Sequence, residues 1–333
     1  MNPLPSPPPP PRIGAVVIGR NEGARLLRCL DSLRHAVAQV VYVDSGSTDG
    51  SAEAARQRGA EVVALDMRRP FTAARARNEG LARLRELAPE LAWVQFVDGD
   101  CEVQPGWLAQ ASAFLAEHPE VVVVCGRRRE RFPHASVYNQ LCDLEWDTPV
   151  GPAQACGGDA LMRIAPLLAV GGYRPDLIAG EEPELCVRLR AAGGRVWRLD
   201  AEMTLHDAAM TRLGQWWQRN RRSGHAFAEG AWLHGAPPER HFLAETRRAL
   251  LWGGVLPGLV LLAGLAHPLG LLLAALYPLQ VLRVARRLQR EGCPIAWAYA
   301  GFLILGRLPE AQGVLTFAWR RLRSRPGQLI EYK

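Results

Sequence analysis

The sequence lacks two short motifs that would place it in other protein classes. It has seven cysteines but no C-x-x-C pair, so we expect reduced thiols in the cytoplasm and no disulfide framework. The polar turn Gly19-Arg20-Asn21-Glu22-Gly23 lacks the G-x-G-x-x-G pattern. A dehydrogenase with that dinucleotide-binding turn is therefore not expected.

The chain also has almost no lysine, and its first residues contain no apolar segment typical of a secretory signal. Residues 1–11 are rich in proline, so we expect a disordered tail there. The formal net charge of +7 is carried by arginine, which favours anionic partners such as diphosphates and an acidic lipid surface. No nucleic-acid-binding motif accompanies this charge, so we expect no nucleic acid partner.

Short apolar runs alternate with helical patterns over the first hundred residues. Strands are predicted at 13–19, 40–43, 61–65 and 93–97, and helices at 24–34, 52–58 and 72–87. This alternation predicts an α/β fold with helices on both faces of a largely parallel sheet. Ligands of such sheets bind at the carboxyl ends of the strands.

Three polar clusters follow three of these strands. They are Arg20-Asn21-Glu22, residues 44–49, and Asp98-Gly99-Asp100. An Asp-x-Asp pair after a buried strand suits a divalent cation that carries phosphates, because Mg²⁺ prefers oxygen ligands. The same three letters are also an ordinary turn sequence. The convergence of all three clusters on one sheet edge favours the binding interpretation.

In this order the motifs RNEG, DSGSTDGS, AARARNEGL and VDGD resemble the nucleotide-sugar half of an inverting family 2 glycosyltransferase of the GT-A type. Cys156–Met162 and the G-E-E-P-E-L segment that begins at Gly180 resemble its acceptor half. The resemblance covers about residues 12–210. It implies a GT-A-type Rossmann-like mixed sheet flanked by helices, with a transferase domain over residues 12–235.

The resemblance implies a donor pocket for a nucleotide-diphosphate sugar. Its members are expected to be Arg20, Glu22, Asp44, Arg75, Asn78, Asp98 and Asp159. Arg75 and Asn78 are three residues apart and share a helix face, whereas Arg77 is expected to point elsewhere. For Asp44 a role in capping the turn remains the alternative, and for Asp49 we favour that role.

The resemblance also implies a bound Mn²⁺ or Mg²⁺ ion, with Asp100 and His206 as ligands. Histidine suits Mn²⁺ better than Mg²⁺, although a lone histidine after a strand can also be a packed polar residue. Glu182 matches the family's catalytic base, and Glu181 is expected to orient the acceptor. The alternative is that both acids only favour a helix start, with Pro183 at its first turn.

Residues 249–282 contain no Asp, Glu, Lys or Arg. The stretch exceeds one crossing of about 20 residues, and the sequence His267-Pro268-Leu269-Gly270 would turn the chain near its middle. Arginines on both sides predict a membrane hairpin whose ends face the cytoplasm, within a helical region at 240–333. Residues 295–305 are too short to cross and are expected at the interface. A buried helix pair in a soluble domain is the alternative.

The apolar stretch and its arginines predict a protein at the inner membrane with its catalytic domain facing the cytoplasm. The resemblance implies a metal-dependent enzyme that transfers a sugar, with inversion, to a hydroxyl of a lipid-linked or cell-envelope glycan acceptor. The alternative is a membrane-tethered binding or scaffold protein with a degenerate transferase domain. The presence of Asp98, Asp100, Glu182 and His206 argues against degeneration.

Overall fold

The computed structural model describes residues 13–323 and divides the chain into two compact units. The first comprises the chain up to Ala135 together with Cys142–Asp176 and Glu181–Ala209. The second comprises Ser136–Leu141, Leu177–Gly180 and the chain from Met210 onward. The predicted proline-rich tail lies outside the described residues.

A single mixed sheet forms the centre of the first unit. Its strands are β1 (Ile13–Gly19), β2 (Gln39–Asp44), β3 (Glu61–Ala64), β4 (Trp93–Asp98), β5 (Cys101–Val103), β6 (Val121–Glu130), β7 (Gly151–Ala153), β8 (Ala160–Arg163) and β9 (Arg195–His206). The order is β3-β2-β1-β4-β8-β6-β9-β5, and β7 pairs with β9. The strands β1 to β4 pair in parallel, whereas β8 runs antiparallel to both of its neighbours. The predicted mixed sheet of an α/β fold is confirmed.

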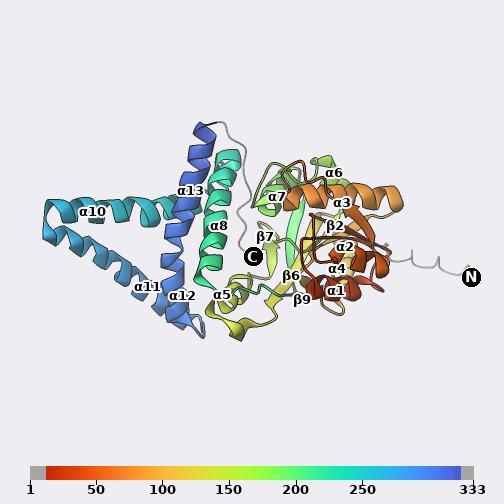
Figure 1. Ribbon diagram of the computed structural model, residues 1–333, viewed down its shortest axis with the longest axis horizontal. Coiled ribbons are helices and arrows are strands. Elements are labelled where there is room, and N and C mark those ends of the chain that lie inside the picture. The colour runs from red at the N-terminus through yellow and green to blue at the C-terminus, as the bar shows by residue number, and fades with distance from the viewer. Residues whose placement is uncertain (1–12, 324–333) are drawn as a thin grey trace, which may run out of the picture. The chain divides into compact units, whose positions relative to one another are not determined.

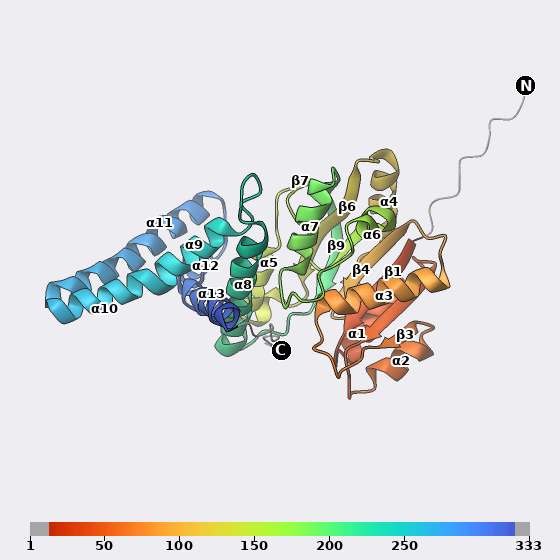
Figure 2. The ribbon, with the colours of Figure 1, turned by 90° about the horizontal axis from the view of Figure 1, so that it is seen from above.

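Helices cover both faces of this sheet. They are α1 (Ala24–Leu33), α2 (Ser51–Gln57), α3 (Ala73–Leu87), α4 (Trp107–Glu117), α6 (Ile164–Ala169) and α7 (Glu181–Ala191). Figures 1 and 2 show α3, α6 and α7 gathered on one face, and Figure 1 shows α1 and α4 on the other. Because β1, β2 and β4 are parallel, their carboxyl ends meet at one edge, which brings the three predicted polar clusters together.

The second unit is helical. It contains α8 (Leu213–His234), α9 (Leu243–Leu250), the π-helical turn η2 (Leu251–Val255), α10 (Leu256–Ala266), the 3₁₀-helix η3 (Pro268–Ala275), α11 (Leu276–Arg290), α12 (Ala296–Leu305) and α13 (Arg307–Leu322). The short helices η1 (Pro133–Ala135) and α5 (Val137–Glu145) lie where the chain passes between the units. A methyl group on Gly224 of α8 would lie 2.0 Å from the Glu310 carbonyl oxygen of α13, so these two helices are in backbone contact.

Candidate active site

Backbone and side-chain hydrogen bonds hold the first two polar clusters in place. Asp44 is buried; its Oδ2 accepts from the backbone N–H groups of Gly46 and Ser47, at 3.1 and 3.0 Å, and its Oδ1 accepts from the Tyr42 hydroxyl at 3.0 Å. Asn21 in the first cluster adopts a positive φ of 56° and accepts from the Thr48 N–H at 2.7 Å. The two clusters therefore form one braced edge of the site.

Three other residues of these clusters, Arg20, Glu22 and Asp49, contact residues outside the clusters. Glu22 pairs with Arg25 at 2.8 Å, and the Arg20 guanidinium lies over the Phe71 ring at 5.0 Å. Asp49 accepts from the Ser51 backbone N–H at the start of α2 at 3.0 Å, as the cap interpretation expects.

Arg77 is the central cation of the site, and the prediction that it points elsewhere is wrong. Its Nη2 donates to Asp98 Oδ1 at 2.9 Å, and its Nη1 lies 2.9 Å from both Glu181 Oε1 and Glu182 Oε1. Arg77 precedes Leu81 and Leu84 by four and seven residues and shares their buried helix face. Its side chain therefore points inward with theirs.

Arg75 and Asn78, which the family resemblance placed beside the nucleotide, contact other residues of the protein. Arg75 pairs with Glu79 at 2.9 Å and donates to the Arg69 carbonyl at 3.2 Å. The Asn78 side chain donates to the Tyr173 carbonyl and accepts from the Tyr173 N–H, at 2.7 and 2.9 Å. Asn78 thus fixes the loop before α7 to α3.

Asp98 lies between two arginines. Arg128 of β6 reaches Asp98 Oδ2 at 3.1 Å and Asp159 Oδ2 at 2.7 Å. Burial opposes ionisation of Asp98, but the charges of Arg77 and Arg128 outweigh it and hold its pKa well below the usual range. Asp98 is therefore a permanent carboxylate at the end of β4.

Asp159 is fully buried, and protein donors occupy both of its oxygens. Oδ1 accepts from the Asp98 backbone N–H at 2.9 Å, while Oδ2 accepts from the Thr204 hydroxyl at 2.7 Å and pairs with Arg128. This environment favours bracing of Asp98 and Arg128 over direct contact with a donor. No sequence pattern marks Arg128, which lies within a run of three arginines.

Glu181 and Glu182 begin α7, and they differ in exposure. Glu181 is buried and Glu182 is half-buried. Burial, together with the negative charge of Glu181, raises the pKa of Glu182 to about 7, against the opposing effect of Arg77. A carboxylate that takes up protons near neutral pH can act as a general base.

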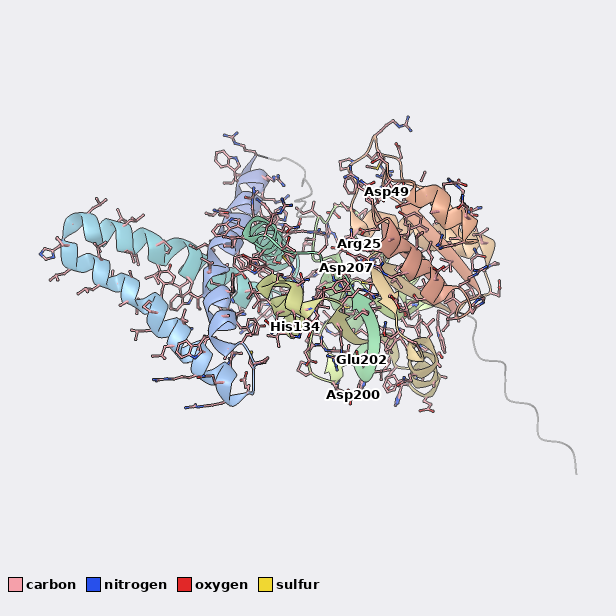
Figure 3. All side chains as sticks on the ribbon, turned by 60° about the horizontal axis from the view of Figure 1, so that its bottom comes forward. Arg25, Asp49, His134, Asp200, Glu202 and Asp207 are labelled. Carbon is pink, nitrogen blue, oxygen red and sulfur yellow. The ribbon has the colours of Figure 1, made fainter. Side chains whose placement is uncertain are left out.

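Asp100 and His206 are brought together by strand pairing. β5 begins directly after Asp100 and pairs with β9, so that Cys101 lies opposite His206. His206 Nε2 lies 3.3 Å from Asp100 Oδ2, and His206 Nδ1 lies 3.4 Å from Glu130 Oε2. The next residue, Asp207, accepts from Arg25 through its carbonyl at 3.4 Å, and Figure 3 shows these two residues close together.

This arrangement fits a divalent cation. Burial lowers the pKa of His206 despite its hydrogen bond to Glu130, which favours the neutral ring. If Nδ1 donates to Glu130, Nε2 presents a lone pair to the Asp100 carboxylate, and a cation can join them; a carboxylate behind a metal-ligating histidine is a recurrent arrangement. Cys101 lies within the same group, but burial raises its thiol pKa well above the usual value.

Comparison with known proteins agrees with this geometry. Residues 15–141 match the family described as Glycosyl transferase family 2. The chain carries, over residues 15–141, a family 2 glycosyltransferase domain. It is 28% identical over 211 residues to the succinoglycan biosynthesis protein ExoA of Rhizobium meliloti, covering 60% of this chain and 64% of that protein. It is 26% identical over 289 residues to a pre-mycofactocin glycosyltransferase of Mycobacterium tuberculosis, covering 82% of this chain and 58% of that protein. The chain thus spans about three fifths of these relatives.

A solved structure shares the fold of the family 2 domain. It is described as the mannosyltransferase PcManGT from Pyrobaculum calidifontis in complex with GDP-Man and Mn²⁺. The TM-score is 0.65 with 21% sequence identity, over 92% of this chain and 87% of that one. This likeness confirms the GT-A-type fold that the sequence motifs predicted, and the family match over residues 15–141 confirms the family.

Two aromatic contacts beside the candidate site were not expected from the sequence. The Trp146 ring lies edge-on to His206, with ring centroids 4.8 Å apart, and the Arg128 guanidinium lies over the Trp146 ring at 5.4 Å. Trp146 is thus in contact with both the candidate metal ligand and the arginine that braces Asp98. No sequence signal marks it, because Trp146 follows α5 and is far from both partners along the chain.

Proposed function

We propose that this protein is a metal-dependent, inverting glycosyltransferase that moves a sugar from a nucleotide-diphosphate donor to a hydroxyl of a lipid-linked or cell-envelope glycan acceptor. One observation carries the proposal. A single guanidinium, Arg77, joins the donor-side carboxylate Asp98 to Glu182, a half-buried carboxylate with a pKa near neutrality. A binding or scaffold protein has no need for such a base.

In the proposed reaction, Glu182 accepts the proton of the acceptor hydroxyl as that oxygen attacks the anomeric carbon. The bond from that carbon to the diphosphate oxygen breaks on the opposite side, so the configuration inverts. Asp100 and His206 would hold Mn²⁺ or Mg²⁺, which supplies positive charge to the departing diphosphate. The nucleobase and ribose of the donor would bind at the edge lined by Arg20, Glu22 and Asp44.

Arg77 and Asp159 act as positioning residues in this proposal. Arg77 keeps Glu181 and Glu182 in fixed orientations, and Asp159 holds the backbone of Asp98. Arg75 and Asn78 support the loop and helix geometry around the site. We place the enzyme at the inner membrane with its catalytic domain facing the cytoplasm, where nucleotide sugars are available.

Purified full-length protein tests the proposal. Nucleotide sugars are screened with Mn²⁺ by thermal shift, because a ligand that binds only the folded state raises the melting temperature. Donors that bind are then tested for slow hydrolysis and for transfer to lipid-linked acceptors. A protein that binds no nucleotide sugar with Mn²⁺ present would favour the scaffold alternative.

The rate of transfer should rise with pH through about 7. Glu182 must be deprotonated to act, and its raised pKa means that the active form is lost as the pH falls below that value. The plateau should lie above pH 8, with about a tenfold loss of kcat per unit well below the pKa. Initial rates at saturating substrate from pH 5.5 to 8.5 measure this profile.

Arg77→Lys provides the control for this profile. Lysine keeps the charge but lacks the planar fork that meets three carboxylates. A single ammonium group cannot contact Asp98, Glu181 and Glu182 together, so Glu182 should lose part of the positive charge that lowers its pKa. The apparent pKa should therefore rise, and kcat should fall. An unchanged profile in Arg77→Lys would mean that another group sets the pH dependence.

A further inference from the structure

Two helical arms of the second unit are long, apolar and scarcely buried. Leu243–Ala266 and Pro268–Arg290 meet the length and composition of membrane spans, with only 11% and 6% of their apolar windows buried. Near their junction at His267, Leu265 is 85% exposed. The helices of a soluble core would bury such residues, which argues against the buried-pair alternative.

The arms pack against each other near the junction. A methyl group on Gly270 would lie 2.3 Å from the Ala263 carbonyl oxygen, and one on Gly264 would lie 2.5 Å from a Leu271 methyl carbon. Small residues allow such close packing between helices in lipid. Figures 1 and 2 show α10 and α11 as the two arms of one hairpin.

Arginines lie at the end of each arm that is farther from His267. Arg247 and Arg248 precede the charge-free part of the first arm, residues 249–266, and Arg283 follows that of the second, residues 268–282. The exposed arginines Arg286, Arg287 and Arg290 continue along the last turns of α11. Basic residues at this position favour contact with anionic lipid headgroups.

The charge-free part of the second arm is three residues shorter than that of the first, but its helix type compensates. The eight residues of η3 are 3₁₀-helical, and a 3₁₀-helix rises about 2.0 Å per residue against about 1.5 Å in an α-helix. Both arms therefore extend about 27 Å from His267 to their first arginine. The hydrocarbon core of a bilayer is about 30 Å thick.

The positions of two aromatic residues are consistent with arms that span the hydrocarbon core. Trp252 and Tyr277 lie within the first turns from the arginines, where Trp and Tyr gather at membrane interfaces. The Tyr277 hydroxyl donates to the Trp252 carbonyl at 2.6 Å. That carbonyl belongs to the π-helical turn η2, and the bond gives it a partner at the edge of the hydrocarbon region, where water is scarce.

We propose that residues 249–282 cross the full width of an anionic phospholipid bilayer twice, with the arginines in one headgroup layer and His267 in the opposite one. An amphipathic hairpin lying in the interface would enter only about 5–10 Å. The proposal deepens the membrane location given under the proposed function and rests on it, but it does not depend on which side the catalytic domain faces.

Cysteine accessibility tests the proposal in the full-length chain. Cys293 is half-exposed and is replaced by serine, whereas the other six cysteines are buried. His267→Cys then reports on the tip, and Gln289→Cys, at an exposed position of α11, reports on the base. Each variant is expressed in a bacterial host, and sealed inside-out and right-side-out membrane vesicles are treated with a membrane-impermeant maleimide.

We expect the two cysteines to react from opposite sides, Gln289→Cys in inside-out vesicles and His267→Cys in right-side-out ones. Reaction of both from the same side, or of the tip from neither side, would overturn the full-width hairpin. If the pair reacts from opposite sides in the reverse sense, the hairpin stands and the cytoplasmic orientation fails. Labelling needs no transfer activity, so the result is independent of the proposed catalysis.

Discussion

Replacing Glu182 with glutamine is expected to lower the rate of sugar transfer by about 10²–10⁴-fold, the usual contribution of a general base. Glutamine keeps the shape of the side chain and cannot accept the proton. The affinities for donor and metal should hardly change, because Asp100, His206 and the edge formed by Arg20 and Asp44 are untouched. Transfer rates are compared with donor affinities from thermal shift on the same preparation.

Glu181→Gln is the matched control, because it removes the neighbouring carboxylate on the same helix turn. Glu181 is buried against Arg77, so it cannot easily meet an acceptor, and its loss should cost less. If Glu181→Gln is inactive and Glu182→Gln is active, the chemistry stands with its base one residue earlier. Full transfer by both variants would reduce the helix start to a structural role. Asp159 is then a poor alternative candidate for the general base, because it is fully buried and both of its oxygens accept hydrogen bonds.

The strands and helices near the donor edge could be predicted from sequence because local patterns determine them. Continuous apolar runs gave β1 and β4 with bounds that differ from the structure by at most one residue. The parallel pairing of β1, β2 and β4 then follows from alternation with helices. The convergence of the polar clusters followed from the same rule, without knowledge of any side-chain contact.

The error at Arg77 has a definite physical origin. The spacing rule correctly placed Arg75 and Asn78 on one helix face, but it does not say which face meets the site. The apolar stripe formed by Leu81 and Leu84 shows which helix face is buried, and Arg77 lies on that face. A buried arginine on an apolar stripe requires carboxylate partners, so the inward position of Arg77 could have been inferred from the sequence.

Other contacts depend on strand order that no local pattern contains. Arg128 meets Asp159 because β8 and β6 are neighbours in the sheet, and His206 meets Asp100 because the short strand β5 closes onto β9. The family resemblance supplied the pairing of Asp100 with His206. It did not supply Glu130 behind the histidine, which comes from the register of β6 against β9.

Replacing Asp100 with alanine should abolish saturable Mn²⁺ binding and lower transfer by about 10³-fold, because a bound cation stabilises developing charge by several kcal/mol and each ~1.4 kcal/mol is tenfold in rate. Asp100 is the carboxylate that faces His206 Nε2. Binding is measured by electron paramagnetic resonance of free Mn²⁺, which reports on the site independently of catalysis.

The matched control for this experiment is Asp207→Asn, which removes a carboxylate that follows His206 in the chain and pairs with Arg28 at 3.4 Å. It should keep Mn²⁺ binding, whereas His206→Asn should weaken it, since the amide is a poorer ligand than imidazole. Circular dichroism confirms that each variant folds. Full transfer by Asp100→Ala in the presence of EDTA would exclude the metal role, and the Asp100–His206–Glu130 group would then be a buried hydrogen-bonded network that only joins β5, β6 and β9.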